Sequence, residues 1–186
     1  MAFPTRAQAL AILTEYTRGE SLLKHAYAVE AAMRHYAAKY GEDAEAWGVA
    51  GLLHDFDYER YPSLEDHPSK GAEILRARGI DEDLIQTILS HAPHTGVVPE
   101  TRMQKTLFAV DELCGLVTAV ALVRPSKKLA DVEAGSVKKK LKDKGFARNV
   151  SREDIASGAV LIGLGLDEHI ANVLAAMQPI AGELGL

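Results

Sequence analysis

Helical periodicity is the feature of this sequence that most limits its fold. Apolar residues recur at intervals of three and four along almost all of the 186 residues, which is the spacing of one face of an α-helix. Capping residues such as Thr5 and Ser151 stand where apolar segments begin, and Gly41 stands where one ends. No alternating run is bounded by hairpin turns. The pattern therefore predicts an all-α fold of about eight or nine helices.

Start and stop signals give the bounds of the expected helices. They are about 5–19, 21–41, 43–54, 69–78, 81–93, 101–123, 151–163 and 167–184. Two short helical pieces, broken by Gly135 and Gly145, are expected before Ser151. A chain of this length suits one domain. We expect a single helical domain over 1–186, with its core at about 20–125, a basic segment at 124–148 and two C-terminal helices.

The charge of the chain is unevenly distributed. The net charge is -5, which argues against a nucleic-acid partner for the chain as a whole. The segment 124–148 differs, because it holds nine Lys or Arg residues and three acids. This local excess of positive charge is a candidate contact for an anion.

Cysteine content and hydropathy bear on the compartment. Cys114 is the single cysteine, so no internal disulfide can form, and its apolar surroundings predict a small core residue. The longest strongly apolar run, 113–123, is too short to span a membrane, and the first residues lack the apolar centre of a signal peptide. We expect a soluble cytoplasmic protein without a membrane partner.

Residues 52–57 read LLHDFD and place His54 and Asp55 at the end of an apolar helix. A buried charge without a partner costs several kcal/mol, on the order of 3–5. His25, His91 and Asp111 also interrupt apolar faces, so separate helices aim imidazole and carboxylate groups at the interior. A divalent cation would explain them together, since it compensates carboxylate charge and accepts neutral imidazole as a ligand.

A simpler interpretation exists for each of these residues taken alone. A histidine on an apolar helix face is often only a hydrogen-bonded core residue, and a buried aspartate often caps a neighbouring helix. His35 and His169 fall on polar stretches, and we expect both at the surface. The metal hypothesis therefore rests on the joint pattern.

The joint pattern resembles a known family. His25, the pair His54-Asp55 and Asp111 are similar to the H…HD…D signature of the HD-domain superfamily of metal-dependent phosphohydrolases. The stretch HDFDYERYPSLEDHPSKGAEIL further resembles the HDIG-type subgroup, in which HPxxGAxIL follows the HD pair, and ILSHxxHTG and AVDEL follow later. The likeness covers about residues 20–125, and the tail resembles a branch of small HD proteins. One departure is that Phe56-Asp57 replaces the family's Ile-Gly.

The resemblance implies a set of metal ligands. A first metal would be held by His25, His54, Asp55 and Asp111. Two-metal members of the family add two histidines, which by position are His67 and His91, with the aspartate of the HD pair as the bridge. The alternative for His67 is that it only caps the helix after Pro68. Such ligands suit Mn, Fe, Co, Ni or Zn, with one or two ions per chain.

Catalytic and substrate-binding residues are expected around that centre. Asp55 would bridge the metals, and His94, Asp57 and Glu59 are the candidates for donating a proton to the leaving oxygen. For a phosphate group on the substrate, the candidates are cations of the basic segment, namely Lys127, Lys128 and Arg148. The alternative for the lysines at 138–140 is the solvated face of an amphipathic helix.

Three functions remain open on the sequence. The first is a metal-dependent phosphohydrolase that acts on a small phosphorylated molecule, with a nucleotide as one candidate. The second is a di-iron oxygenase, because the resemblance extends to such enzymes with similar ligands. The third is a non-catalytic module that binds a metal or a nucleotide. Metal identity separates the first two, and turnover separates both from the third.

Overall fold

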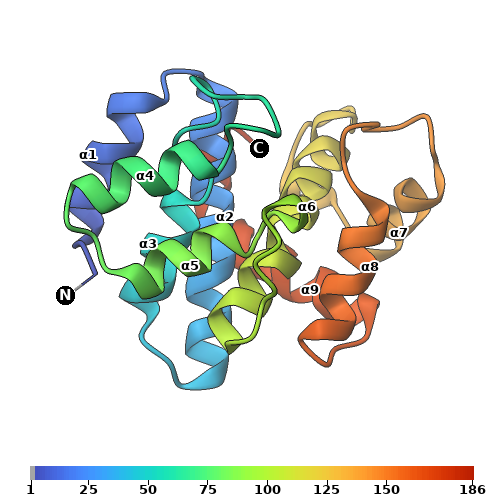
Figure 1. Ribbon diagram of the computed structural model, residues 1–186. Coiled ribbons are helices and arrows are strands. Elements are labelled where there is room, and N and C mark those ends of the chain that lie inside the picture. Colours follow the sequence, from blue (N-terminus) through green and yellow to red (C-terminus); the bar gives the residue numbers. More distant parts are fainter. Residues whose placement is uncertain (1–2) are drawn as a thin grey trace.

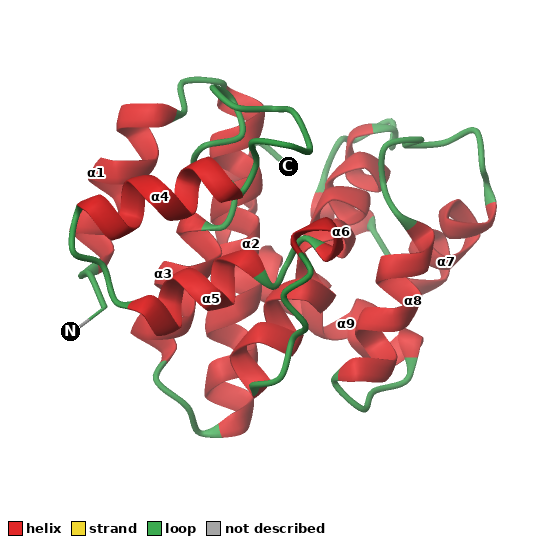
Figure 2. Cartoon of the chain, viewed as in Figure 1, coloured by secondary structure: helices red, strands yellow, loops and turns green. Residues whose placement is uncertain are grey.

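The computed structural model describes residues 3–186, and it contains helices but no strand over that range (Figure 1; Figure 2). Within these residues, nine α-helices have eight or more residues and a tenth has four, which confirms the predicted all-α fold. They are α1 (Arg6–Tyr16), α2 (Glu20–Tyr40), α3 (Ala44–Leu53), α4 (Ser69–Ala77), α5 (Glu82–Leu89), α6 (Arg102–Leu122), α7 (Ala134–Lys142), α8 (Arg152–Leu161), α9 (Leu166–Met177) and α10 (Ala181–Leu184). Short 3-10 turns lie at Pro93–Thr95, Leu129–Asp131 and Gln178–Ile180.

The two longest helices, α2 and α6, form the centre of the molecule. Helices α1, α3, α4 and α5 lie on one side of them, and α7, α8 and α9 lie on the other (Figure 1). Helix α2 packs against α3, α6 and α9, while α6 also packs against α8. Both central helices are lined with buried apolar residues, such as Met33 on α2 and Leu113 on α6. The core therefore runs through the whole chain and fixes α2, α3 and α6 relative to one another.

Capping residues set most of the helix starts as predicted. Thr5 and Thr101 each form a capping box with a glutamine three residues later. Asp43, Asp81 and Ser151 accept backbone N–H groups at the starts of α3, α5 and α8. These local signals explain why the bounds of most helices could be read from the sequence.

Several predicted bounds differ from the structure. Helix α1 ends at Tyr16 rather than near Gly19, and the last predicted helix is divided, because α9 ends at Met177 and a 3-10 turn separates it from α10. Helix α2 begins at Glu20 with Gly19 as its N-cap, so Ser21 is not the cap, and α5 ends at Leu89 rather than near Pro93. Gly135 lies inside α7 and does not break it. The penultimate helix begins at Leu166, and its N-cap is Gly165 rather than Asp167. Where no side chain caps a helix, tertiary packing decides the bound and the sequence signal is weak.

Close contact between α2 and α3 brings two of the candidate ligands together. A Cβ atom on Gly51 would lie 2.8 Å from the backbone of Glu30, so this glycine lets the two helix backbones touch. His54 lies three residues after Gly51, at the C-cap of α3. The glycine therefore places the end of α3 against α2, which carries His25.

Cys114 and His169 are two side chains whose burial was predicted from the sequence, one as a core residue and one as a surface residue. Cys114 is fully buried, as predicted. The prediction that His169 lies at the surface was wrong, because its side chain is fully buried between helices. Its Nδ1 is 2.7 Å from the hydroxyl of Tyr36 in α2, and its Nε2 is 2.9 Å from the carbonyl oxygen of Ala109 in α6. His169 thus links α9 to both central helices.

Among the described residues, no single helix is both long enough and apolar enough to cross a bilayer. The pair Arg152–Leu161 and Leu166–Leu184, which is bent by 96°, reaches the required length and composition only when its two parts are taken together.

Candidate metal centre

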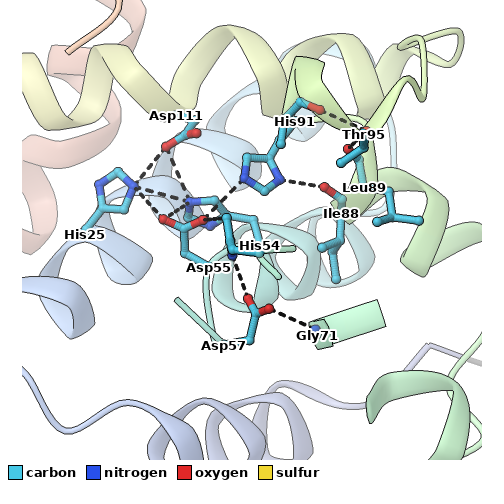
Figure 3. Close-up of polar contacts among 12 residues, drawn as sticks. His25, His54, Asp55, Asp57, Gly71, Ile88, Leu89, His91, Thr95 and Asp111 are labelled. Atoms are coloured by element: carbon cyan, nitrogen blue, oxygen red, sulfur yellow. Dashed lines mark hydrogen bonds and ion pairs between the residues drawn. The ribbon is translucent and has the colours of Figure 1, made fainter. Parts of the chain in front are cut away.

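Six histidine and aspartate side chains from separate elements converge between α2, α3 and α6. His25 lies in α2, Asp111 lies in the middle of α6, and the pair His54-Asp55 ends α3. His67 comes from the loop before α4, and His91 follows α5 by two residues. Figure 3 shows the imidazole rings of His25, His54 and His91 turned toward the carboxylates of Asp55 and Asp111. The structure therefore brings together all six residues expected to bind metal.

The first group of possible ligands consists of His25, His54, Asp55 and Asp111, and one donor atom from each lies within 4.8 Å of the others. Asp111 Oδ1 is 2.9 Å from His25 Nε2 and 3.4 Å from His54 Nε2. The two imidazole nitrogens are themselves 3.3 Å apart. Asp55 Oδ2 completes the group at 3.5 Å from His54 Nε2. Two nitrogens and two oxygens thus face one point.

The second group consists of Asp55, His67 and His91. Asp55 Oδ1 lies 3.2 Å from His67 Nε2 and 3.3 Å from His91 Nε2. The other oxygen of the same carboxylate belongs to the first group. Asp55 therefore has the position of a bridge between two adjacent ligand groups.

Three of the imidazole rings form a hydrogen bond through Nδ1, the nitrogen that faces away from the carboxylates of the cluster, and these bonds orient the rings for binding a metal. Nδ1 of His54 is 2.8 Å from the carbonyl oxygen of Gly51, and Nδ1 of His91 is 2.5 Å from that of Ile88. Nδ1 of His67 is 2.8 Å from the carboxylate of Asp57. Each acceptor favours the proton on Nδ1, which leaves the Nε2 lone pair directed at Asp55 or Asp111. This is the ring orientation that a divalent cation requires of its ligands.

The charges in the cluster also favour a cation. Burial by itself would raise the pKa of Asp111, but the neighbouring His54 and His25 outweigh it and hold the pKa below its usual value. Burial likewise opposes a charge on His67, yet Asp55 and Asp57 raise the pKa of His67 to about 9. The pKa values of His54 and His91 are raised by nearby carboxylates, Asp55 and Asp111, against the effect of burial. The cluster thus attracts positive charge strongly.

The three candidates for donating a proton have different surroundings. Asp57 is fully buried and accepts a hydrogen bond from Nδ1 of His67. It also accepts the backbone N–H of Gly71, a contact that Figure 3 shows. Glu59 accepts the backbone N–H groups of Arg18 and Gly19 at the start of α2. His94 Nε2 is 2.7 Å from the carbonyl oxygen of His67. All three lie beside elements that carry ligands, and their catalytic roles stay predictions.

The predicted anion-binding residues lie outside the ligand cluster. The side chains of Lys127, Lys128 and Arg148 are exposed, and none forms an ion pair with the described residues. Lys138 and Lys140, in contrast, pair with acids on the surface. The first three are thus available to an anion, and their role stays a prediction.

Glu112 is a partly buried acid at the site that the sequence analysis did not single out. It follows Asp111 and accepts the backbone N–H of Ser151 at 3.0 Å. Burial, together with the adjacent charge of Asp111, raises the pKa of Glu112 to about 7. The only signal in the sequence was its position next to an expected ligand.

Comparison with known proteins agrees with the geometry. Residues 22–113 match the family model of the HD domain. Ribonuclease Y of Thermotoga petrophila is 30% identical over 139 residues, which cover 73% of this chain and 27% of that relative. Ribonuclease Y of Cutibacterium acnes is 28% identical over 118 residues, covering 62% of this chain and 20% of the relative. The chain thus spans about a fifth to a quarter of the length of these curated relatives.

No solved structure matches this chain closely enough to be counted as a relative. The family match covers the elements that carry all six expected ligands, from α2 to the middle of α6. This chain therefore carries an HD domain and belongs to the HD-domain superfamily.

Proposed function

We propose that this protein hydrolyses phosphate esters of a small molecule, with nucleotides as the first class to test, and that a water molecule activated by divalent metal attacks the phosphorus atom. The observation that carries the proposal is the position of Asp55, whose two oxygens face different ligand groups. A carboxylate that faces two such groups suits a two-metal site. In such sites bound metals supply an activated water and stabilise the charge of the attacking and leaving oxygens.

Residues of this chain would hold that centre in place. His25, His54 and Asp111 would complete the first ligand set with Asp55, and His67 and His91 the second. The mutual distances of the first ligand set are fixed by α2, α3 and α6, which pack directly on one another, so little reorganisation of that set is needed on binding. Side chains of His25, Asp55 and Asp111 are each about one-fifth exposed, so part of the cluster is accessible to solvent.

The free cations of the basic segment support a phosphorylated substrate. Lys127, Lys128 and Arg148 are exposed and have no acidic partner among the described residues. Arg148 belongs to the segment just before Ser151, whose backbone N–H is bonded to Glu112 next to Asp111. We therefore propose these three residues as contacts for the substrate phosphate.

Ribonucleic acid is a comparison substrate for this proposal. The relatives that the chain matches are named ribonucleases, but the matched part is about a quarter of their length. A net charge of -5 gives the chain no overall attraction to a polyanion. We propose a small phosphate ester in preference to RNA, and hydrolysis of both should be measured.

The experiment begins with elemental analysis of the purified protein. Phosphate or alcohol release from a generic aryl phosphate, from nucleotides and from short RNA is then measured with Mn, Fe, Co, Ni or Zn added. We expect turnover of a small ester with at least one of these metals. Metal-loaded protein that releases nothing from any of these substrates would contradict the proposal.

A di-iron oxygenase is the second candidate, because the second ligand group is complete. His67 and His91 reach the same oxygen of Asp55, an arrangement that would equally hold a second iron. Consumption of dioxygen by the ferrous protein, in the presence of a small polyol or its phosphate, would favour the oxygenase. Hydrolysis under anaerobic conditions with a metal that has no redox chemistry, such as Zn, would favour the hydrolase.

A further inference from the structure

Asp57 is the buried acid that distinguishes this chain from the HDIG pattern, in which a glycine stands at this position. Its side chain is fully buried, and both of its oxygens are occupied. Oδ1 lies 2.8 Å from Nδ1 of His67. Oδ2 accepts the backbone N–H of Gly71 at 2.8 Å, the contact drawn in Figure 3. Its oxygens therefore have little freedom to approach a substrate.

We propose that Asp57 is instead a positioning residue, which holds His67 with Nε2 directed at Asp55 and so preassembles the second metal site. His67 comes from a loop, whereas His25, His54 and Asp111 lie in or at the end of helices. The Asp57 carboxylate is the hydrogen-bond acceptor next to Nδ1 of His67. The inference rests on the proposed two-metal function of the site.

Gly71 makes room for this contact. A Cβ atom at position 71 would lie 2.8 Å from Cγ of Asp57 and 3.0 Å from the ring of Phe56. The glycine of the HPSKGAEIL stretch thus lets the first turn of α4 reach the carboxylate, and its N–H fixes Oδ2. Asp57, Gly71 and His67 form one connected unit.

A carboxylate at position 57 has two acceptor oxygens and a negative charge, whereas a neutral amide has one acceptor oxygen and no charge. Asp57 can accept hydrogen bonds from His67 and from Gly71 at the same time, and its negative charge strengthens the imidazole as a ligand. An asparagine has a single acceptor oxygen, so it leaves one of the two donors without its partner. If that oxygen stays with Gly71, the amide NH₂ faces Nδ1 of His67 and favours the proton on Nε2, where it blocks metal binding.

The test is calorimetric titration of the metal-free full chain with Mn²⁺, for the native protein and for Asp57→Asn. We expect the affinity for the second equivalent to fall roughly 10- to 100-fold in the variant. The affinity for the first equivalent should change less than about threefold. Unchanged affinity for the second equivalent would overturn the proposal.

Two further variants keep the test decisive. Glu65→Gln removes one negative charge from an exposed side chain two residues before His67, and it should leave both affinities unchanged. Asp57→Gly restores the glycine of the HDIG pattern and removes the acceptor of His67. If Asp57→Asn does not fold, the same titration is made with Asp57→Gly. Weaker binding of the second Mn²⁺ equivalent in Asp57→Gly would support the proposal, and native binding of that equivalent would overturn it.

Excess metal separates a positioning role from the alternatives. If Asp57 acts through His67, raising the Mn²⁺ concentration should restore hydrolysis by Asp57→Asn toward the native rate. A proton donor would not be restored in this way, and neither would a collapsed fold. If the native protein binds two metals but hydrolyses no ester, the proposed function fails while the metal affinities still decide the role of Asp57.

Discussion

The two ligand groups that share Asp55 are built in different ways. The first takes its other ligands from α2, the end of α3 and the middle of α6, which pack directly on one another. The second takes His67 from a loop and His91 from the turn after α5, and it holds them through acceptors behind their rings. The first group is therefore fixed by the core and the second by local hydrogen bonds. We expect the first to bind metal more tightly.

Removing the shared carboxylate should have the largest effect. Asp55→Ala takes one oxygen from each group and leaves the clustered histidines without their common acid. We expect metal binding at both groups and all hydrolysis to be lost, which elemental analysis and an assay of phosphate release would show. Asp66→Asn, which neutralises a carboxylate that accepts a hydrogen bond from the hydroxyl of Ser63, is the matched control. Native metal content in Asp55→Ala would contradict the bridging role.

Removing one ligand from each group should then separate them. Asp111→Ala takes away the carboxylate that contacts both His25 and His54, so the tighter site should fail and hydrolysis with it. His91→Ala takes away a ligand of the second group only, so the bound metal should fall from two equivalents to about one. Hydrolysis should then decrease by roughly 10- to 100-fold.

Titration calorimetry of the two variants measures the difference directly. The proposed difference between the two ligand groups would be contradicted if Asp111→Ala kept the more tightly bound metal equivalent, or if His91→Ala lost both metal equivalents. Equal losses in the two variants would show that the groups bind metal cooperatively, as one unit, rather than as a rigid site and a locally held one.

The sequence predicted the first group more fully than the second, for a physical reason. His25 and Asp111 stood out because a polar residue on an apolar helix face is visible as a break in helical periodicity. The acceptors behind the rings of the second group could not be predicted, since a bond such as that from His91 to Ile88 depends on the exact path of a turn. Asp57 was singled out, but its bond to Gly71 depends on how α4 packs.

His169 shows the same limit in the scaffold of the first group. Asp167 and Glu168 precede it in sequence, yet its ring is buried between α2 and α6, where its hydrogen-bond partners are residues 60 and 133 positions away. Long-range partners of this kind leave no local signal. The helices and most of their caps could be predicted, whereas contacts between them could not.

Replacing His169, which forms hydrogen bonds from α9 to the helices of the first group, should have a smaller effect, and this effect is on the stability of the fold. Burial lowers the pKa of His169, so its folded state holds the neutral ring while the unfolded chain titrates near the ordinary value of 6.5. As the pH falls below about 6.5, the unfolded state takes up a proton that the folded state resists, and this residue's contribution to the free energy of unfolding decreases. Above that pH the contribution is constant.

Denaturant unfolding of the metal-free native protein and of His169→Gln, at about pH 7.5 and about pH 5.5, tests this sign. The variant should be less stable by about 1–3 kcal/mol at the higher pH, because buried donors and acceptors lose a partner. The difference in the free energy of unfolding between the native protein and His169→Gln should become smaller at the lower pH, because glutamine does not titrate. His35→Gln, at a half-buried histidine in α2, is the matched control. A gap that widens at the lower pH would contradict the assignment of a neutral buried ring.

The smallest effect is expected at the substrate contacts, which belong to neither ligand group. Lys127 is exposed and lies outside the metal cluster, so Lys127→Ala should leave metal content and stability unchanged. If Lys127 binds the substrate phosphate equally well in the ground state and the transition state, KM should rise roughly five- to tenfold while kcat changes less than about twofold. Steady-state kinetics on the best small ester measures both constants. Lys138→Ala is the control, because that lysine already pairs with Asp167 on the surface. Unchanged KM and kcat in Lys127→Ala would remove Lys127 from the substrate site, and a fall in kcat alone would mean that its charge acts only in the transition state.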